Sequence, residues 1–178
     1  MIETARLRLR PWREEDKDAF AAMVNTPAMM SHFGGVRPRA DMDALVDAQI
    51  ASQQVDGFSM WAVDWRETGD LVGIVGLRRA HHPDVAITGE LEAGWRIAEP
   101  FWGKGVAREA AAAAIAWGWA HTPDRRIVAY TTAANTPSWG LMERLGMQRR
   151  VELDFRHPRF DAADPLGAMI VYAIDRPT

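Results

Sequence analysis

Residues 99–110 read EPFWGKGVAREA, and this stretch decides the fold. A strand pattern precedes it, and an alanine-rich helix pattern covers residues 106–121. A glycine turn between a strand and a helix is suited to anions, because the first backbone N–H groups of the helix have no partner within it. Gly103 and Gly105 let a phosphate approach the backbone, and Lys104 adds a positive charge. The stretch therefore predicts a phosphate-binding loop.

Two commoner phosphate-binding motifs do not fit this loop. A Walker A loop requires a glycine, four further residues and then Gly-Lys-Ser/Thr. Ala98 stands at the first glycine position, and Gly105 follows Lys104 where the hydroxyl residue belongs. The dinucleotide fingerprint Gly-x-Gly-x-x-Gly would have its third glycine at Arg108, so it fails as well. A plain turn that needs two glycines is the alternative interpretation.

Length and composition indicate one globular domain. The chain has 178 residues, of which 48% are hydrophobic and 25% are charged. Both fractions are ordinary for a chain with a single core. The net charge of −3 gives no reason to expect nucleic-acid binding. Since the chain has no cysteine, disulfides, thiolate nucleophiles and cysteine metal ligands are excluded.

Neither a membrane nor a metal is expected as a partner. The N-terminus lacks the apolar segment of a signal peptide, and the apolar stretch at residues 110–120 is about half of a membrane span. A cytoplasmic protein is therefore expected. His81 and His82 would point to opposite sides of a strand, and no further ligands accompany them.

The rest of the chain alternates between two periodicities. Segments with period 2 predict strands, and segments with period 3.6 predict helices. We expect one α+β domain over residues 1–178, with a mostly antiparallel twisted sheet of about seven strands and about four flanking helices. The expected strands are 7–10, 58–65, 71–79, 85–97, 127–132, 148–155 and 168–174, and the expected helices are 14–24, 39–53, 106–121 and 138–145, with a short helical piece at 28–33.

The glycine loop resembles the acetyl-CoA loop of the GNAT superfamily of N-acyltransferases. The family pattern is Gln/Arg-x-x-Gly-x-Gly/Ala, and Pro100 replaces its leading residue. That replacement, with WGKG at 102–105, resembles the branch of the ribosomal-protein-alanine N-acetyltransferases. The resemblance covers nearly the whole chain and implies a GNAT-like fold. Its further matches, in family order, are residues 6–12, 61–63, 72–77, 92–97, 135–138 and 142–147.

The resemblance implies acetyl-CoA as the acyl donor and no metal. In the family, backbone amides of the loop hold the pyrophosphate, and the preceding strand binds the pantetheine arm through its backbone. Asn135 matches an asparagine whose side chain contacts the same arm, and it is also suited to cap a helix. The residues assigned to acetyl-CoA in this way are Trp95, Arg96, Ile97, Trp102, Gly103, Lys104, Gly105, Val106, Ala107, Asn135 and Ser138.

Acyl transfer to an amine needs a neutral nucleophile, stabilisation of the oxyanion and a proton for the leaving thiolate. Glu92 matches an acid that family members place on this strand, so we expect it to accept the amine proton. Glu90 is the second candidate. On a strand both side chains would face one side, and the like charge would raise the pKa of one carboxyl group. Two solvated glutamates, or recognition of a cationic amine without proton transfer, are the alternatives.

The leaving thiolate has no evident proton donor. Many GNAT enzymes use a tyrosine on the fourth helix, and Met142 occupies that place here. Ser138 is the nearest hydroxyl by the same analogy, although the chemistry of a helix N-terminus explains it equally well. A thiol with a pKa near about 8.5 also leaves without a dedicated acid at mildly alkaline pH.

Apolar groups are expected beside the acceptor. Phe33 and Trp61 are assigned to this role, with a place in the core as the alternative. The branch includes enzymes that act on protein N-termini, small amines and antibiotics, and Glu90 and Glu92 favour a cationic acceptor. We expect an acetyl group to move from acetyl-CoA to a primary amine by direct attack in a ternary complex. His157 either orders its polar loop or borders the acceptor.

A protein that binds acyl-CoA with little catalysis, such as a sensor module, is the alternative function. Met142 in place of the family tyrosine supports it. Turnover with any amine separates the two functions. The eight tryptophans leave room for an apolar interface, so a homodimer is compatible with the sequence.

Overall fold

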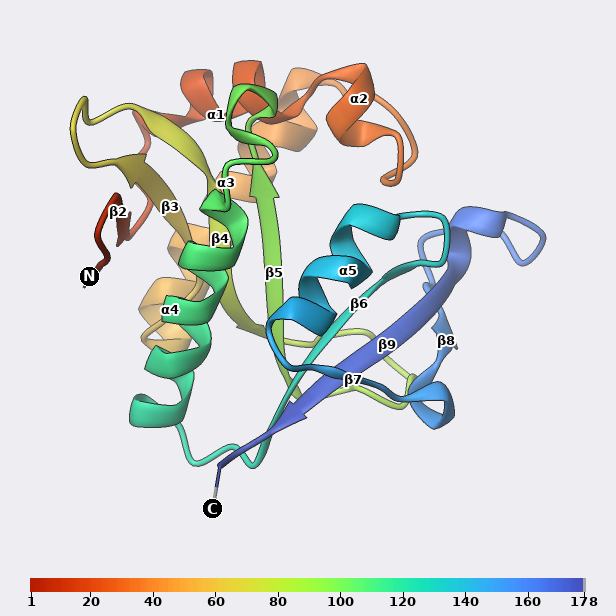
Figure 1. Cartoon of the computed structure of the whole chain (residues 1–178). Helices are drawn as coiled ribbons and strands as arrows, with labels where there is room; N and C mark the ends of the chain where they lie inside the picture. Colours follow the sequence, from red (N-terminus) through yellow and green to blue (C-terminus); the bar gives the residue numbers. More distant parts are fainter. Residues whose placement is uncertain (178) are drawn as a thin grey trace.

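A mixed sheet runs through the computed structural model, which describes residues 1–177. Within these residues the sheet has nine strands, and helices cover both of its faces (Figure 1). In chain order the strands are β1 (Ile2–Glu3), β2 (Leu7–Arg10), β3 (Met60–Trp65), β4 (Leu71–Arg79), β5 (Leu91–Ile97), β6 (Arg126–Thr132), β7 (Gln148–Arg149), β8 (Phe155–Arg156) and β9 (Ala168–Asp175).

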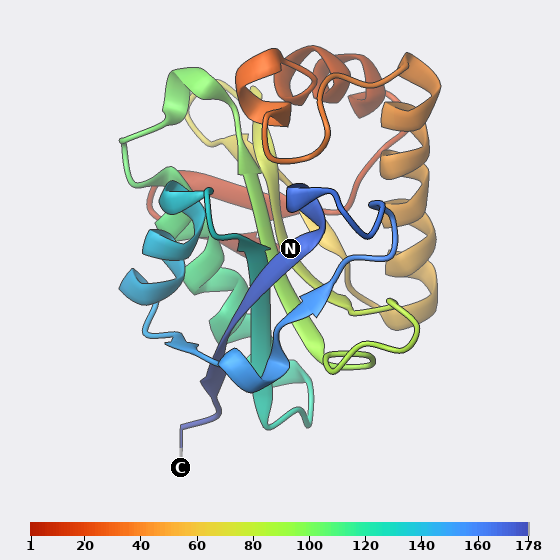
Figure 2. The same ribbon diagram turned by 90° about the vertical axis from the view of Figure 1, so that its right-hand side faces the viewer.

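The helices form two layers. Figure 2 shows α3 on the right and α4 and α5 on the left, with the strands between them. One hydrophobic cluster joins α4 to the sheet, and a second joins α1, α2 and α3 to its other face. The helices are α1 (Asp16–Val24), α2 (Pro27–Met30), α3 (Arg39–Asp56), α4 (Val106–His121) and α5 (Thr136–Arg144), with 3₁₀ turns at Glu99–Phe101, Val151–Leu153 and Pro165–Gly167.

The strand order determines where α4 begins. Neighbouring strands follow the order β1-β2-β3-β4-β5-β6-β9-β7, and β8 pairs with β9 beside this path. In the part of the chain that the structure describes, β5 and β6 are the only parallel neighbours. Parallel neighbours need a crossover connection, and α4 supplies it. The chain therefore passes from the end of β5 through the 3₁₀ turn at Glu99–Phe101 and the glycine loop into the first turn of α4.

Small residues let α4 lie close to the sheet. Ala110 and Ala114 are buried in one cluster with Leu77 of β4. A Cβ atom at Gly118 would lie only 2.6 Å from Leu77 Cδ1, so an added side chain here would push Leu77 aside. The alanine-rich helix is confirmed with the bounds that the sequence predicts.

The α+β class and the mostly antiparallel sheet are confirmed, but the strands differ from the prediction in three respects. The strand expected at residues 148–155 is interrupted by the 3₁₀ turn Val151–Leu153, which leaves only the two-residue strands β7 and β8. The short strand β1 is an addition, so the number of strands exceeds the expected one. In addition, β5 begins at Leu91 and not at residue 85. The reason is a pair of turns, in which the Thr88 N–H donates to the Val85 carbonyl (3.1 Å) and the Glu90 N–H to the Ile87 carbonyl (3.0 Å).

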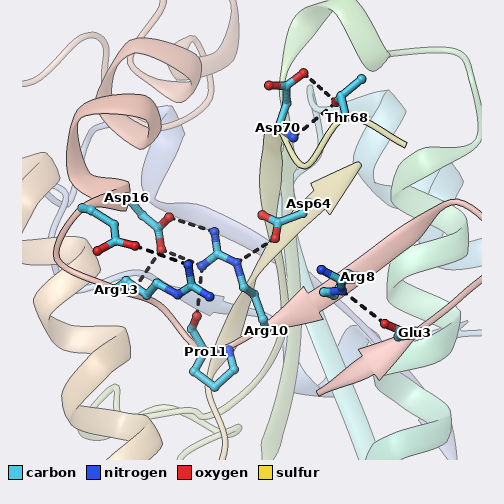
Figure 3. Close-up of polar contacts among 10 residues, drawn as sticks. Glu3, Arg8, Arg10, Pro11, Arg13, Asp16, Asp64, Thr68 and Asp70 are labelled. Carbon is cyan, nitrogen blue, oxygen red and sulfur yellow. Dashed lines mark hydrogen bonds and ion pairs between the residues drawn. The ribbon is translucent and has the colours of Figure 1, made fainter. Parts of the chain in front are cut away.

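A buried arginine joins the N-terminal strand to the helical layer (Figure 3). Arg10 donates two hydrogen bonds to the carboxylate of Asp16 on α1, at 2.7 and 2.8 Å. Its Nε atom donates to Asp64 of β3 at 2.7 Å. Burial raises the pKa of Asp16, but the hydrogen bonds from Arg10 and from the Arg13 N–H outweigh that effect and lower it. Asp16 therefore stays ionised, and together with Asp64 it holds Arg10 in place.

We predict that Arg10→Ala destabilises the protein by about 3–5 kcal/mol, because two buried carboxylates lose their cation. The matched control is Arg8→Ala, which removes an exposed pair with Glu3 and should cost at most about 1 kcal/mol. Urea unfolding of both variants measures the difference. Equal losses in the two variants would contradict the structural role of the buried cluster.

Candidate active site

Strands β5 and β6 separate soon after they begin (Figure 1). Their pairing consists of two residue pairs, and Glu92 with Val128 is the last. Beyond it, β5 stays paired with β4 as far as Ile97, and β6 stays paired with β9 as far as Thr132. The edge of β5 that faces β6 therefore carries backbone groups without a strand partner. Such an edge can hydrogen-bond an extended ligand that has amide groups of its own.

The glycine loop presents unpaired N–H groups at the start of α4. No backbone N–H of residues 103–108 donates to a backbone carbonyl of residues 1–177. The first to do so is that of Glu109, which donates to the Gly105 carbonyl at 3.0 Å. Gly103 and Gly105 have φ values of 71° and 76°, a left-handed conformation that favours glycine. This geometry suits an anion such as a pyrophosphate.

Side chains from the N-terminus hold this loop. Arg6 donates to a Glu109 carboxylate oxygen at 2.7 Å and to the Lys104 carbonyl at 3.1 Å. The Thr4 hydroxyl donates to the same carboxylate at 2.6 Å. Burial raises the pKa of Glu109, but the hydrogen bonds from Thr4 and Arg6 outweigh burial, so the pKa is lowered. An ionised Glu109 therefore fixes the first turn of α4 without entering the loop.

Polar groups also lie on the β6 side of the gap between β5 and β6, at the end of β6 and the start of α5. Asn135 occupies the N-cap position of α5, but its side chain makes no capping bond and donates to Thr131 Oγ1 at 2.9 Å. Thr132 Oγ1 is buried without a hydrogen-bond partner among the described residues. Ser138 is half-buried in the first turn of α5, and Met142 is buried in the core. Because Asn135 does not cap α5, its side chain lies beside the end of β6, where a ligand with amide groups can reach it.

Glu92 belongs to a chain of hydrogen bonds on the α1–α3 face of the sheet. Arg78, directly opposite it on β4, donates to both of its carboxylate oxygens, at 3.0 and 2.7 Å. Arg78 also donates to the Tyr130 hydroxyl at 3.0 Å, and that hydroxyl lies 2.7 Å from His82 Nε2. The chain thus runs from a buried carboxylate to the partly exposed loop before β5.

The chemistry of arginine fixes the direction of one of these hydrogen bonds. Arg78 can only donate, so the Tyr130 oxygen accepts from it, and the Tyr130 proton is free to point to His82 Nε2 when that nitrogen carries no proton. Burial, together with the charges of Arg78 and His81, lowers the pKa of His82. His82 is therefore neutral at pH 7, and in the tautomer with its proton on Nδ1 its Nε2 atom accepts from Tyr130. The site holds a neutral imidazole that is ready to accept a proton.

The expectation that Glu90 and Glu92 perturb each other is wrong. Glu90 precedes β5 and forms an ion pair with Arg126, whereas Glu92 pairs with Arg78. Burial raises the pKa of Glu92, and the guanidinium of Arg78 opposes that rise. Two separate arginines neutralise the two acids, so neither is a free carboxylate that attracts a cationic acceptor.

The two aromatic residues expected beside the acceptor lie in different places. Trp61 is only 3% exposed and packs against Trp117 of α4, with ring centroids 5.0 Å apart. It is therefore a core residue, and the acceptor role expected for it is wrong. Phe33 is half-buried, and the guanidinium of Arg96 lies 4.1 Å from its ring centroid. Phe33 thus lies on the face of β5 that carries Glu92 and Arg96.

The structure joins the expected cofactor residues of β5 to those of the glycine loop. Trp95, Arg96 and Ile97 lie on β5 beyond the separation from β6. The indole N–H of Trp102 donates to the Ile97 carbonyl at 2.5 Å, which ties the glycine loop to the end of β5. Trp102 remains 48% exposed, so its ring borders the loop from the solvent side.

Sequence reasoning missed Arg78, Tyr130 and the role of His82. The register of β4 and β5 places Arg78 opposite Glu92. The length of the turns between these strands hid that register, so no sequence signal identified it. Within residues 1–177, no group of three or more histidine, aspartate or glutamate side chains could hold a metal ion. No helix of the described residues is long and apolar enough to cross a membrane.

Comparison with known proteins agrees with this geometry. A family model described as Acetyltransferase (GNAT) domain matches residues 6–148. The chain is 28% identical to the uncharacterized N-acetyltransferase p20 of Bacillus licheniformis, over 83% of this chain and 82% of that protein. An acetyltransferase of Agrobacterium tumefaciens str. C58 has a TM-score of 0.77 at 26% identity and covers 97% of this chain and 92% of that chain. An acetyl transfer enzyme of Salmonella typhimurium, which modifies the N-terminal serine of ribosomal protein L7/L12, shares the fold with a TM-score of 0.77 at 16% identity, over 97% of this chain and 96% of that chain.

We predict that Gly103→Ala weakens acetyl-CoA binding by about tenfold or more, because the loop must leave its left-handed conformation and turn its N–H groups away. Gly69→Ala is the matched control. Gly69 also has a positive φ (79°), and no atom lies within 4 Å of an added Cβ at either position. Both variants should lose a similar roughly 1–2 kcal/mol of stability. Calorimetric titration with acetyl-CoA tests this prediction, and equal affinities of the two variants would contradict it.

Proposed function

The chain belongs to the GNAT acetyltransferase family, and from that premise we propose that it moves an acetyl group from acetyl-CoA to a primary amine, either a protein N-terminus or a small-molecule amine. The separation of β5 from β6 beside the unpaired N–H groups of residues 103–108 carries this proposal. It offers a strand edge for an amide-containing arm and an anion site for a pyrophosphate on one continuous path. The bound thioester supplies an acetyl group that is activated for attack by an amine.

Residues on both sides of this path are proposed to hold acetyl-CoA. The pyrophosphate would accept hydrogen bonds from Gly103, Gly105 and the first residues of α4. The pantetheine amides would pair with the backbone of Trp95 and Ile97. Asn135 is proposed to reach the same arm from α5, since its side chain does not cap the helix. Attack by the amine takes place with both substrates bound, so no acetylated side chain is needed.

The amine must lose a proton when its bond to the acetyl carbon forms. We propose that the Tyr130 oxygen receives this proton while Tyr130 passes its own to His82 Nε2. The raised pKa of Tyr130, due first to burial and then to the charge of Glu92, keeps the hydroxyl neutral between turnovers. Glu92 then acts by holding Arg78, and Arg78 orients the Tyr130 hydroxyl. Glu92 is thus a positioning residue in this proposal.

A second proton must be supplied to the leaving thiolate of CoA. Ser138 stays the proposed donor, because it lies half-buried at the start of α5 and Met142, which replaces the family tyrosine, is buried in the core. A thiolate whose conjugate acid has a pKa near about 8.5 also leaves with help from solvent alone. Ser138→Ala therefore slows the reaction most at low pH if Ser138 is the donor.

We predict that the protein releases CoA from acetyl-CoA in the presence of a primary amine and forms an equal amount of acetylated amine. Both products are measured, by thiol titration and by mass spectrometry. Binding is measured in parallel by the thermal shift with acetyl-CoA, CoA and ATP. Ligand at 100 times its dissociation constant adds roughly 2.7 kcal/mol to the free energy of unfolding, which raises the melting temperature. A shift with both CoA species and no turnover with any amine would favour an acyl-CoA-binding module instead. No shift would remove the basis of the proposal.

We predict that Tyr130→Phe lowers kcat by about 10²-fold or more, the usual scale for a lost proton acceptor, and leaves acetyl-CoA affinity unchanged. The variant keeps the ring that packs on Phe155 and loses only the hydroxyl. Tyr172→Phe is the matched control, since the Tyr172 hydroxyl makes a single long hydrogen bond of 3.4 Å to Glu143.

The pH profile gives a second test of the same chain. The pKa of His82 is lowered, so His82 stays neutral until the pH falls below its ordinary value of 6.5. Protonation of His82 should therefore lower the kcat/KM of the native enzyme only below pH 6.5. His82→Asn should abolish this fall of kcat/KM at acid pH, and His81→Asn should leave it in place. An unchanged fall in His82→Asn would exclude His82 as the proton acceptor.

A further inference from the structure

Three arginines gather on the α1–α3 face of the site without a carboxylate partner. Arg37 follows α2, Arg96 lies on β5, and Arg159 lies on the loop after β8. Among residues 1–177, none of the three forms an ion pair. Other arginines of the chain, such as Arg10 and Arg79, pair with aspartates. The group of three is therefore a local excess of positive charge.

Phe33 brings two of these arginines together, Arg96 and Arg159. The guanidinium of Arg96 lies over its ring, at 4.1 Å from the centroid, and Arg159 donates to its carbonyl at 2.8 Å. A Cβ atom at the adjacent Gly34 would lie 3.5 Å from the ring of Phe160. The loops around residues 33 and 160 thus lie side by side near the C-terminal end of β5 (Figure 2). An aromatic ring offsets only part of a guanidinium charge, so Arg96 still lacks an anion.

The charges in this region act on one another. Burial, together with the charges of Arg78, Arg37 and Arg159, lowers the pKa of Arg96 to about 10. Burial also lowers the pKa of His157 to about 4, with help from the charges of His82, Arg159 and Arg78. Burial is the largest cause of both shifts, and the neighbouring positive charges add to it.

The acids nearby do not cancel this excess. Both carboxylate oxygens of Glu92 are taken by Arg78. Asp164 lies on the loop of Arg159, but its side chain accepts from the Leu166 N–H. Asp161 on the same loop is exposed and forms no ion pair within residues 1–177. The missing anion is therefore expected to come from a ligand.

We propose that Arg37, Arg96 and Arg159 form a subsite for a negatively charged group of the acceptor, a carboxylate or a phosphate, so that the acetylated amine belongs to an anionic molecule. This inference rests on the proposed acetyl transfer. A guanidinium suits both groups, because its planar fork makes paired, charge-assisted hydrogen bonds with either. The subsite lies on the same face of β5 as the chain from Glu92 to His82. The cationic acceptor favoured by the sequence is replaced by an anionic one.

Pairs of amines that differ in one anionic group test the subsite. The pairs are β-alanine with propylamine, O-phosphoethanolamine with ethanolamine, and Ala-Glu amide with Ala-Gln amide. The anionic member of at least one pair should have a kcat/KM about tenfold or more above its neutral partner. The first two pairs also separate a carboxylate source from a phosphate source. Equal or better turnover of all the neutral members would overturn the inference and leave acetyl transfer intact.

Charge-removing variants tie the preference to these residues. Arg96→Gln and Arg159→Gln should each reduce the preference for the anionic member by about tenfold, mainly through the KM of the amine, and Arg159→Gln should leave acetyl-CoA affinity unchanged. Arg159 is exposed, so its variant keeps the test valid if Arg96→Gln fails to fold. Arg13→Gln is the control, since its guanidinium is exposed and pairs with Glu15. A preference that persists in both test variants would overturn the assignment.

A binding measurement separates this inference from the proposed function. Each amine of the six is titrated calorimetrically into the native protein saturated with CoA, which occupies the pyrophosphate site. Binding of an anionic member that exceeds its neutral partner by about tenfold, and that is lost in Arg159→Gln, supports the subsite even if no amine is acetylated. Absence of turnover then counts against acetyl transfer alone. Equal binding of all pairs would overturn the subsite.

Discussion

The early end of the pairing between β5 and β6 is the constraint on which the site depends. A parallel pair needs a crossover helix, so the end of β5 leads directly into the glycine loop and α4. Because the strands separate after Glu92 and Val128, the rest of β5 keeps one paired edge and one free edge. The free edge and the unpaired N–H groups of residues 103–108 lie next to each other as a result.

The same separation divides the side chains of β5 between two tasks. Trp95 and Ile97 face the layer of α4, where apolar contacts hold the strand in place. Glu92 and Arg96 face the other side, where they meet polar partners from β4, β6 and two loops. Arg78 pairs with Glu92 and donates to Tyr130, so Arg96 keeps a charge without an ion-pair partner among the described residues. In the proposed function, one strand serves the acyl donor with its backbone and the acceptor with its side chains.

Local patterns predicted the elements of the fold well, and the site only in part. Alternation, turn glycines and the alanine-rich helix are local signals, so α4 and the hairpin of β3 and β4 follow from the sequence. The glycine loop and the strand before it were identified in the same way. Partners across strands were not, because register depends on the turns between them. Irregular turns at residues 85–90 therefore concealed the pairing of Arg78 with Glu92, and burial of Trp61 depends on a helix far along the chain.

Amide hydrogen exchange with and without acetyl-CoA tests the central claim most directly. The claim is that backbone groups of β5 and of the glycine loop, unpaired in the free protein, hold the acyl donor. Peptides that cover residues 93–97 and 103–108 should gain protection on binding, while β4, already paired on both edges, should change little. Binding that protects other segments and leaves both of these unchanged would contradict the account.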